Sequence, residues 1–232
     1  MEDLERIKER LENIQSVEPI ITSLRTIAAG GWRTALRHAQ AARQYVEHIT
    51  EVLAVLASQM DAATLTRARV HLQRRRARRA LMLVIASERG LCGSFNEVVL
   101  TGAERLIAQQ QLQSDEVLIG TLGSRAEAYF TAQGRDLFLS YPLPVTRVAS
   151  FELVRSIGEQ LLKVLDSGEV DAIYVIYSPY KMAITAPPVS QRWMPIEVAS
   201  LPSRSADWPP PIIETDRRIL FRRALEEWTY AR

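Results

Sequence analysis

The chain has 232 residues, 47% of them hydrophobic, which is enough for one large domain or for one compact domain with an extension. Its 29 basic and 27 acidic residues leave a net charge of +2. The overall charge is therefore too small to indicate binding of nucleic acid or of an acidic substrate. One cysteine excludes an internal disulfide, and no uncharged apolar stretch reaches the ~18 residues that cross a bilayer, so we expect membrane contact only through partner proteins.

Residues 1–60 are predicted to form a long coiled-coil arm. With Leu4 at heptad position a, apolar or small residues fill positions a and d as far as Leu56, interrupted only by Glu18 and Arg25. A narrow seam with a period of about 3.5 residues is typical of a coiled coil, because a globular helix buries a wider face. The alternative is an ordinary long helix in a bundle. Pro19 lacks an N–H, so we expect a kink there, or a helix that restarts with Pro19 as its first residue.

A basic connector is predicted between the arm and the first strand, over residues 61–79. Its arginines are Arg67, Arg69, Arg74, Arg75, Arg76, Arg78 and Arg79. No aromatic residues are interleaved with them, which argues against stacking on single-stranded nucleic acid. A solvated surface run is the favoured interpretation. If the cluster is functional, we expect it to face acidic partner subunits.

Residues 80–200 are predicted to form a Rossmann-like α/β domain, because apolar segments of strand length alternate with helical ones and so indicate a mostly parallel sheet. The expected strands are 80–86, 116–121, 137–140 and 172–177, and the expected helices are 95–111, 124–133 and 151–165. After Pro179, the run 180–186, the turn at Pro187 and Pro188, and the run 191–196 resemble an antiparallel hairpin added to the sheet.

The C-terminal part is predicted to contain a stiff proline-rich linker, residues 201–213, and the start of a return helix, residues 214–232. Thr215 or Asp216 can cap this helix. Phe221, Ala224, Trp228 and Ala231 repeat at spacings of three and four and begin a second apolar seam. Because the seam reaches Arg232 without a stop signal, we expect a shortened chain, or an arm that pairs with another chain or folds back. The expected fold class is therefore α/β, with a long N-terminal coiled-coil helix and the start of a C-terminal helix.

The ten residues from Ser87 to Asn96 read SERGLCGSFN and directly follow the first predicted strand. They resemble the SDRGLCGxFN signature of the gamma subunit of F-type ATP synthases. Residues 20–35 are similar in pattern to that family's KITKAMKMVAAAKLRRA segment, although Pro19 and Gly31 stand where the family has lysines. Residues 173–197 resemble its YLVYNxFxSAISQxPxVxxLLPI stretch. The matches lie in the family's order along the chain.

This resemblance implies a central-stalk subunit, the rotor shaft that transmits torque between a membrane ion-driven rotor and the catalytic nucleotide-binding ring. The implied partners are the alpha and beta subunits of the ring, the epsilon subunit and the membrane rotor ring. The implied place is the cytoplasmic side of the cell membrane, as a peripheral, non-catalytic part of a proton-transporting complex. The residues expected to contact the ring are Leu24, Arg25, Ile27 and Ala28. The signature turn consists of Ser87, Glu88, Arg89, Gly90, Leu91, Cys92, Gly93, Phe95 and Asn96.

No catalytic, cofactor or metal site is expected. The phosphate-binding pattern GxxxxGK[ST] is absent, and His38, His48 and His71 form no zinc ligand set with Cys92. The turn from Gly90 to Gly93 has amides that could hold an anion, but a tight structural turn is favoured. Two other functions stay open: a non-rotary scaffold or interaction protein derived from the gamma fold, and a small-molecule-binding α/β domain that uses the carboxyl edge of its sheet.

Overall fold

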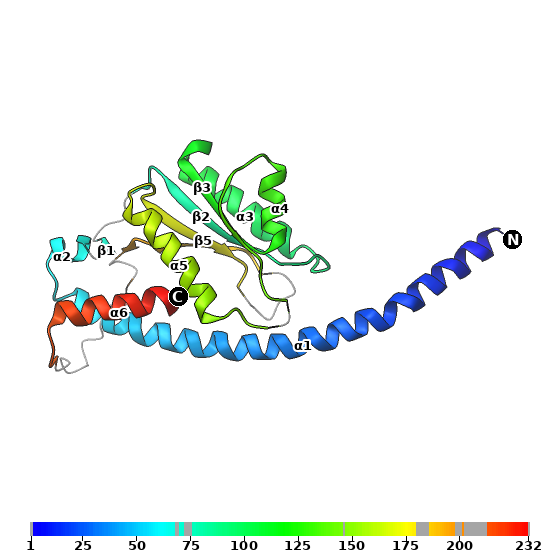
Figure 1. The fold of residues 1–232 in the computed structure, drawn as a ribbon, viewed down its shortest axis with the longest axis horizontal. Helices are drawn as coiled ribbons and strands as arrows, with labels where there is room; N and C mark the ends of the chain where they lie inside the picture. The colour runs from blue at the N-terminus through cyan, green and yellow to red at the C-terminus, as the bar shows by residue number, and fades with distance from the viewer. Residues whose placement is uncertain are drawn as a thin grey trace.

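A long helix and a sheet-based body make up the chain in the computed structural model, which describes residues 2–67, 70–71, 76–145, 147–179, 186–197, 201 and 213–231. The helix is α1 (Glu2–Ala57). Its N-terminal part projects well beyond the body, and its C-terminal part lies along helix α6 (Arg217–Ala231) at the base of the body (Figure 1). The two termini therefore lie far apart, although α1 and α6 are neighbours.

Helix α1 runs without interruption through Pro19, so the predicted restart of the helix at that residue is wrong. Proline removes one helical hydrogen bond, but all residues from Gln15 to Ser23 are exposed, and the carbonyl left without its N–H can bind water. The hydroxyl of Ser23 also donates to the Pro19 carbonyl oxygen at 2.9 Å. The result is the gentle curve of the free part of α1 in Figure 1, without a break.

The body contains a five-stranded sheet in the order β4-β3-β2-β5-β6. Strands β2 (Ala80–Ile85), β3 (Val117–Leu122), β4 (Leu137–Tyr141) and β5 (Ala172–Tyr177) are parallel, and β6 (Val189–Met194) is antiparallel to β5. The four predicted parallel strands are confirmed, β5 to the residue. The predicted antiparallel addition is confirmed for 191–194 in β6, whereas 180–185 and the linker residues 202–212 lie outside the described residues.

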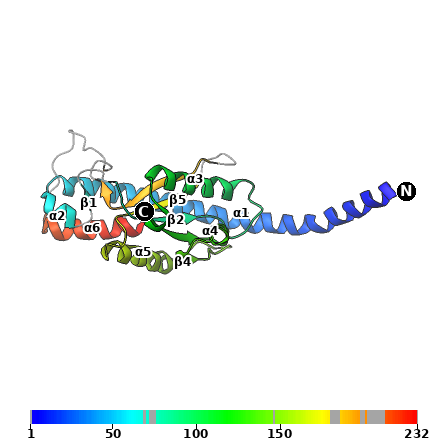
Figure 2. The same cartoon turned by 90° about the horizontal axis from the view of Figure 1, so that it is seen from above.

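Helices cover both faces of this sheet, as Figure 2 shows for α3 (Phe95–Gln110) and α5 (Phe151–Asp166). Helices α3 and α4 (Ser124–Ala132) pack on one face, around Val84, Phe130 and their neighbours. On the other face α5, α6 and the base of α1 share one apolar core. The predicted helices are confirmed. A second, two-stranded sheet that the sequence did not indicate pairs β1 (Val70–His71) with β7 (Ile196–Glu197), and the short α2 (Ala62–Arg67) precedes it.

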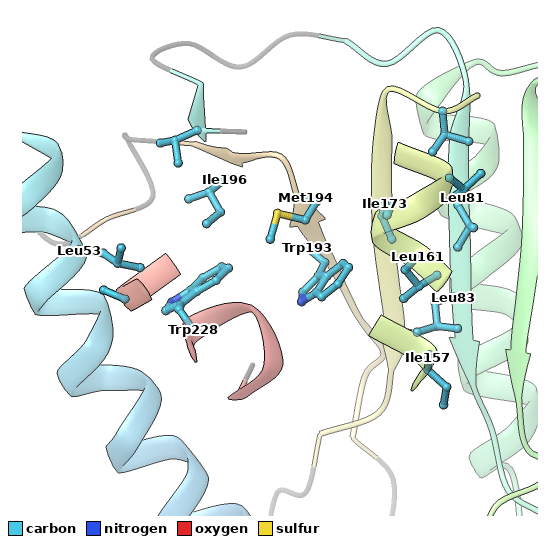
Figure 3. Packing of buried hydrophobic residues seen from close by; sticks show 14 of the residues in the cluster. Leu53, Leu81, Leu83, Ile157, Leu161, Ile173, Trp193, Met194, Ile196 and Trp228 are labelled. Atoms are coloured by element: carbon cyan, nitrogen blue, oxygen red, sulfur yellow. The ribbon is translucent and has the colours of Figure 1, made fainter. Parts of the chain in front are cut away.

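The base of α1 is locked to α6 by apolar packing and by hydrogen bonds. Leu53, Leu56 and Trp228 are almost fully buried in the core drawn in Figure 3. The indole N–H of Trp228 donates to the Thr50 hydroxyl oxygen at 2.8 Å, and α6 begins at a cap in which the Asp216 carboxylate accepts from the Arg218 and Ile219 amides. The predicted Asp216 cap and the predicted seam of α6 are thus confirmed.

Candidate functional site

The apolar seam of α1 changes from buried to exposed along the helix. At the base, Leu53 is 1% exposed, and Val46 and Ile49 pack against the same core. Toward the N-terminus the seam residues are open to solvent, and Leu11 and Ile14 are 53% and 66% exposed. The exposed large residues of this free arm are Ile7, Leu11, Ile14, Val17, Ile20, Ile21, Leu24, Ile27 and Trp32. An apolar stripe of this length on a projecting helix is typical of a protein-binding surface.

The residues predicted to contact a ring lie within this stripe. Leu24, Arg25, Ile27 and Ala28 are all exposed on α1. Spacings of three and four place Leu24, Ile27 and Ala28 next to one another on one side of the helix, with Arg25 beside Ala28. The structure therefore brings the four together as one patch, while their contact with a ring stays a prediction.

The turn from Ser87 to Ser94 joins β2 to α3 and is tied together by its own polar side chains. The Ser87 amide donates to Asn96 Oδ1 at 3.0 Å, and Asn96 Nδ2 donates to Cys92 Sγ at 3.1 Å. The Ser87 hydroxyl donates to the Arg89 carbonyl oxygen. The serine, the cysteine and the asparagine of the signature therefore fix the shape of one tight turn, which is the structural role that the sequence favoured over anion binding.

Glu88 connects this turn to two distant segments. Its carboxylate accepts from the Ser124 hydroxyl, from the Ser124 amide at 3.2 Å and from the Leu143 amide at 2.9 Å. These bonds, first that from the Ser124 hydroxyl and then that from Leu143, hold the pKa of Glu88 below its usual value. Because Ser124 begins α4, the carboxylate also lies at the positive end of that helix. An internal anion thus occupies a position where α/β proteins often bind phosphate groups.

Backbone geometry at the tip of the turn exposes an apolar side chain. Leu91 has φ of 62° and Gly93 has φ of 57°, both in the left-handed region, where a leucine is strained. The Leu91 side chain is fully exposed. At Gly90 a side chain would meet the Arg125 guanidinium, with its Cβ 2.7 Å from Nη2. The turn is therefore closely packed at Gly90 and open at Leu91, a residue whose individual exposure the sequence pattern did not indicate.

The side chains around Cys92 bear on whether the turn could be catalytic. The thiol of Cys92 accepts from Asn96, and no histidine lies in the turn to activate it as a nucleophile. Within the described ranges, no group of three or more His, Cys, Asp or Glu residues is placed to hold a metal ion. The described helices likewise include none that is long and apolar enough to span a membrane.

Comparison with known proteins places these features in a family. The sequence profile of a family described as ATP synthase matches residues 3–231. Curated relatives named ATP synthase gamma chain include one from Sorangium cellulosum, 29% identical over 217 residues, and one from Chloroherpeton thalassium, 28% identical over 199 residues. Each alignment covers 84% of this chain but 66% and 64% of the two relatives, so the chain spans slightly less than two thirds of their length.

Among solved structures, a chain from the central stalk and c-ring of Tetrahymena thermophila mitochondrial ATP synthase has a similar fold. The TM-score is 0.61 at 16% sequence identity, and the superposition covers 91% of this chain and 90% of that chain. This likeness includes both the long helix and the α/β body, because it extends over nearly the whole chain. At this identity it shows a shared fold.

Proposed function

We propose that this chain, which belongs to the ATP synthase family, is a central-stalk rotor shaft that transmits torque between a membrane ion-driven rotor and a catalytic ring. Its curated relatives are named gamma chains, and its fold joins a long helix to an α/β body. In this role the chain carries no catalytic residues itself. It works as a non-catalytic subunit of a complex that catalyses ATP synthesis.

The observation that carries this proposal is the contrast between the anchored base and the free arm of α1. A shaft must be fixed at one end and must offer a surface to be gripped at the other. At about 1.5 Å per residue, the 56 residues of α1 span roughly 84 Å, which is longer than a compact body of this size needs. The apolar stripe of the arm is the surface that the ring would contact, and the packing of Leu53 and Trp228 fixes the base of α1 to the body.

The proposal assigns a partner to each part of the chain. The alpha and beta subunits of the catalytic ring hold the arm, residues 1–60, with Leu24, Arg25, Ile27 and Ala28 in contact. The body, residues 80–200, carries the signature turn and meets the epsilon subunit and the membrane rotor ring. Residues 61–79 and 201–213 connect the body to α1 and α6. The complex is a proton-transporting one, peripheral on the cytoplasmic side of the cell membrane.

Glycine substitution in the contact patch tests this assignment. In a complex reconstituted with its alpha and beta subunits, Leu24→Gly with Ile27→Gly should lower coupled ATP turnover about tenfold or more, because both apolar contacts are lost. A matched control is Ser23→Gly with Thr26→Gly, which places the same number of glycines in the same turns and costs the helix up to about 1 kcal/mol per site in the same way. Equal turnover in the two double variants would refute the contact assignment.

A non-rotary scaffold is the second candidate, and the exposure of the same stripe favours it. Such a protein would use the stripe to hold partners without turning. The two functions differ in one observable: a shaft must rotate relative to the ring during ATP hydrolysis, whereas a scaffold stays fixed to its partners. Cross-linking the arm to a ring subunit should therefore stop turnover by a shaft and leave turnover by a scaffolded assembly unchanged.

A further inference from the structure

A hollow of about 660 Å³ is lined by residues of α2, α5, α6 and β6. Figure 1 shows α2 and the start of α6 at the end of the molecule opposite the free tip of α1. Its floor is apolar and includes the half-buried Leu162 and Leu225 together with the buried Met194 and Phe221. Its wall is polar, with Arg67 from α2 and with Arg218, Arg222 and Glu226 from α6. The hollow is separate from both the arm and the signature turn.

Positive charge dominates this wall among the described residues, which supply three arginines and one glutamate. Arg218 lies 3.8 Å from the Asp61 carboxylate, but both side chains are more than half exposed, so this ion pair is weak. Arg67 is exposed, and its Nε donates to the Ala63 carbonyl oxygen of its own helix at 3.3 Å. Arg222 has no ion-pair partner in the part of the chain that the structure describes. The hollow is thus suited to a negatively charged ligand.

The shape and chemistry of the hollow favour a peptide over a small anion. The adjacent helix ends are already capped, since Asp61 accepts from the Thr64 amide at 2.7 Å and Asp216 caps α6. A phosphate ion would therefore find guanidinium groups but few amides, and it would leave the apolar floor uncovered. A membrane surface would touch the rim but could not enter a recess walled by helices. A peptide segment with both apolar and acidic side chains can cover the apolar floor and pair with the arginines of the wall at the same time.

We propose that this hollow binds an acidic amphipathic segment of a partner protein. Apolar side chains of the segment pack on Leu162 and Leu225, and its carboxylates pair with Arg67, Arg218 and Arg222. Arginine suits this role because its planar group binds a carboxylate through two parallel hydrogen bonds. The proposal does not rest on the shaft function, because it concerns a different surface and can be tested with the isolated chain.

The test uses the purified full chain and a fluorescent helical peptide of glutamate, leucine and alanine, with leucines on one face. A second peptide with lysine in place of glutamate is the reference. We expect the glutamate peptide to bind, the lysine peptide not to bind, and the affinity to fall as salt is raised. Arg222→Glu should weaken binding about tenfold or more, since it replaces an attraction by a repulsion.

Arg223→Glu is the matched control. It makes the same charge change on the next residue of α6, which does not line the hollow, and it should leave the affinity within about twofold. Both arginines are exposed, and thermal unfolding will show that each variant is folded. Arg222→Gln should give an intermediate loss.

Three results would overturn the proposal. The glutamate peptide could bind the Arg222→Glu variant as tightly as the unchanged chain, or Arg223→Glu could weaken binding equally, which would mean attraction to net charge alone. Alternatively, the peptide could fail to bind while inorganic phosphate or phosphatidylserine vesicles bind in an Arg222-dependent way. That last outcome would assign the hollow to a phosphate group or to a lipid headgroup.

Discussion

The base and the free arm of α1 carry the same heptad seam in opposite surroundings. Leu53 and Leu11 both occupy position a, yet one is 1% and the other 53% exposed. The difference arises from α6, which packs along the base of the helix and leaves the arm uncovered within the described residues. A single sequence pattern thus has two outcomes: it anchors the helix where α6 packs against it, and it leaves an apolar surface exposed where no described helix does.

The largest expected effect compares two leucine substitutions. Leu53→Ala should lower the free energy of unfolding by about 2–5 kcal/mol, because it leaves a cavity in the core. Leu11→Ala makes the same chemical change at the same heptad position and should change that free energy by no more than about 0.5 kcal/mol. Urea denaturation followed by circular dichroism measures both. Similar losses for the two variants would show that the arm packs against the body in solution.

A second prediction concerns the rigidity of the body at Glu88. Glu88→Gln should cost about 1–3 kcal/mol of stability at neutral pH, because charge-assisted bonds to Ser124 and Leu143 are weakened. Since folding lowers the pKa of Glu88, its contribution is present above the pH at which an unfolded glutamate protonates, about 4.3, and is lost as pH falls through the folded pKa. Denaturation at several pH values should therefore show that the unfolding free energies of the unchanged chain and of the Glu88→Gln variant become equal in acid. A difference in unfolding free energy that persists at acid pH would mean that the charge of Glu88 does not cause the loss of stability.

The anchor itself can be weakened at the cap of α6. Asp216→Ala removes the acceptor for the Arg218 and Ile219 amides and should cost about 1 kcal/mol. Asp216→Asn keeps a side-chain acceptor and is the matched control, with a smaller loss. If both substitutions leave the melting temperature unchanged, α6 does not contribute to the global stability that the comparison of the two leucines assumes.

The smallest effect on global stability is expected at Pro19. Pro19→Ala restores a helical hydrogen bond in the free arm, so amide exchange around residues 15–23 should slow while the global unfolding free energy stays within about 0.5 kcal/mol. Hydrogen–deuterium exchange read by mass spectrometry separates local protection around residues 15–23 from a change in global stability. A large gain in global stability would contradict the independence of arm and body.

The sequence predicted the elements that have strong local signals. Strand β5 was found to the residue because Ala172–Tyr177 is a continuous apolar run, and the Asp216 cap was found because the residue type and the following seam agree. The restart of α1 that the sequence predicts at Pro19 is wrong, because the cost of a proline depends on whether the freed carbonyl can reach water. Strands β1 and β7 were missed because two residues show no periodicity.

The candidate surfaces likewise include features that local sequence patterns predict and features that appear only in the folded chain. The seam of the arm follows from heptad spacing, but its division into buried and exposed halves depends on where α6 docks. The contacts of Glu88 with Ser124 and Leu143 join residues 36 and 55 positions apart, so they require the folded sheet. The arginine hollow combines residues from α2 and α6 that no local pattern connects.

The central claim is that α1 turns within a ring while the body moves with it. The most direct measurement is single-molecule rotation: a gold particle attached to the body is observed while the immobilised alpha and beta ring hydrolyses ATP. The account predicts stepwise rotation in one direction that stops when ATP is removed. A particle that stays fixed while the same complexes hydrolyse ATP would contradict it.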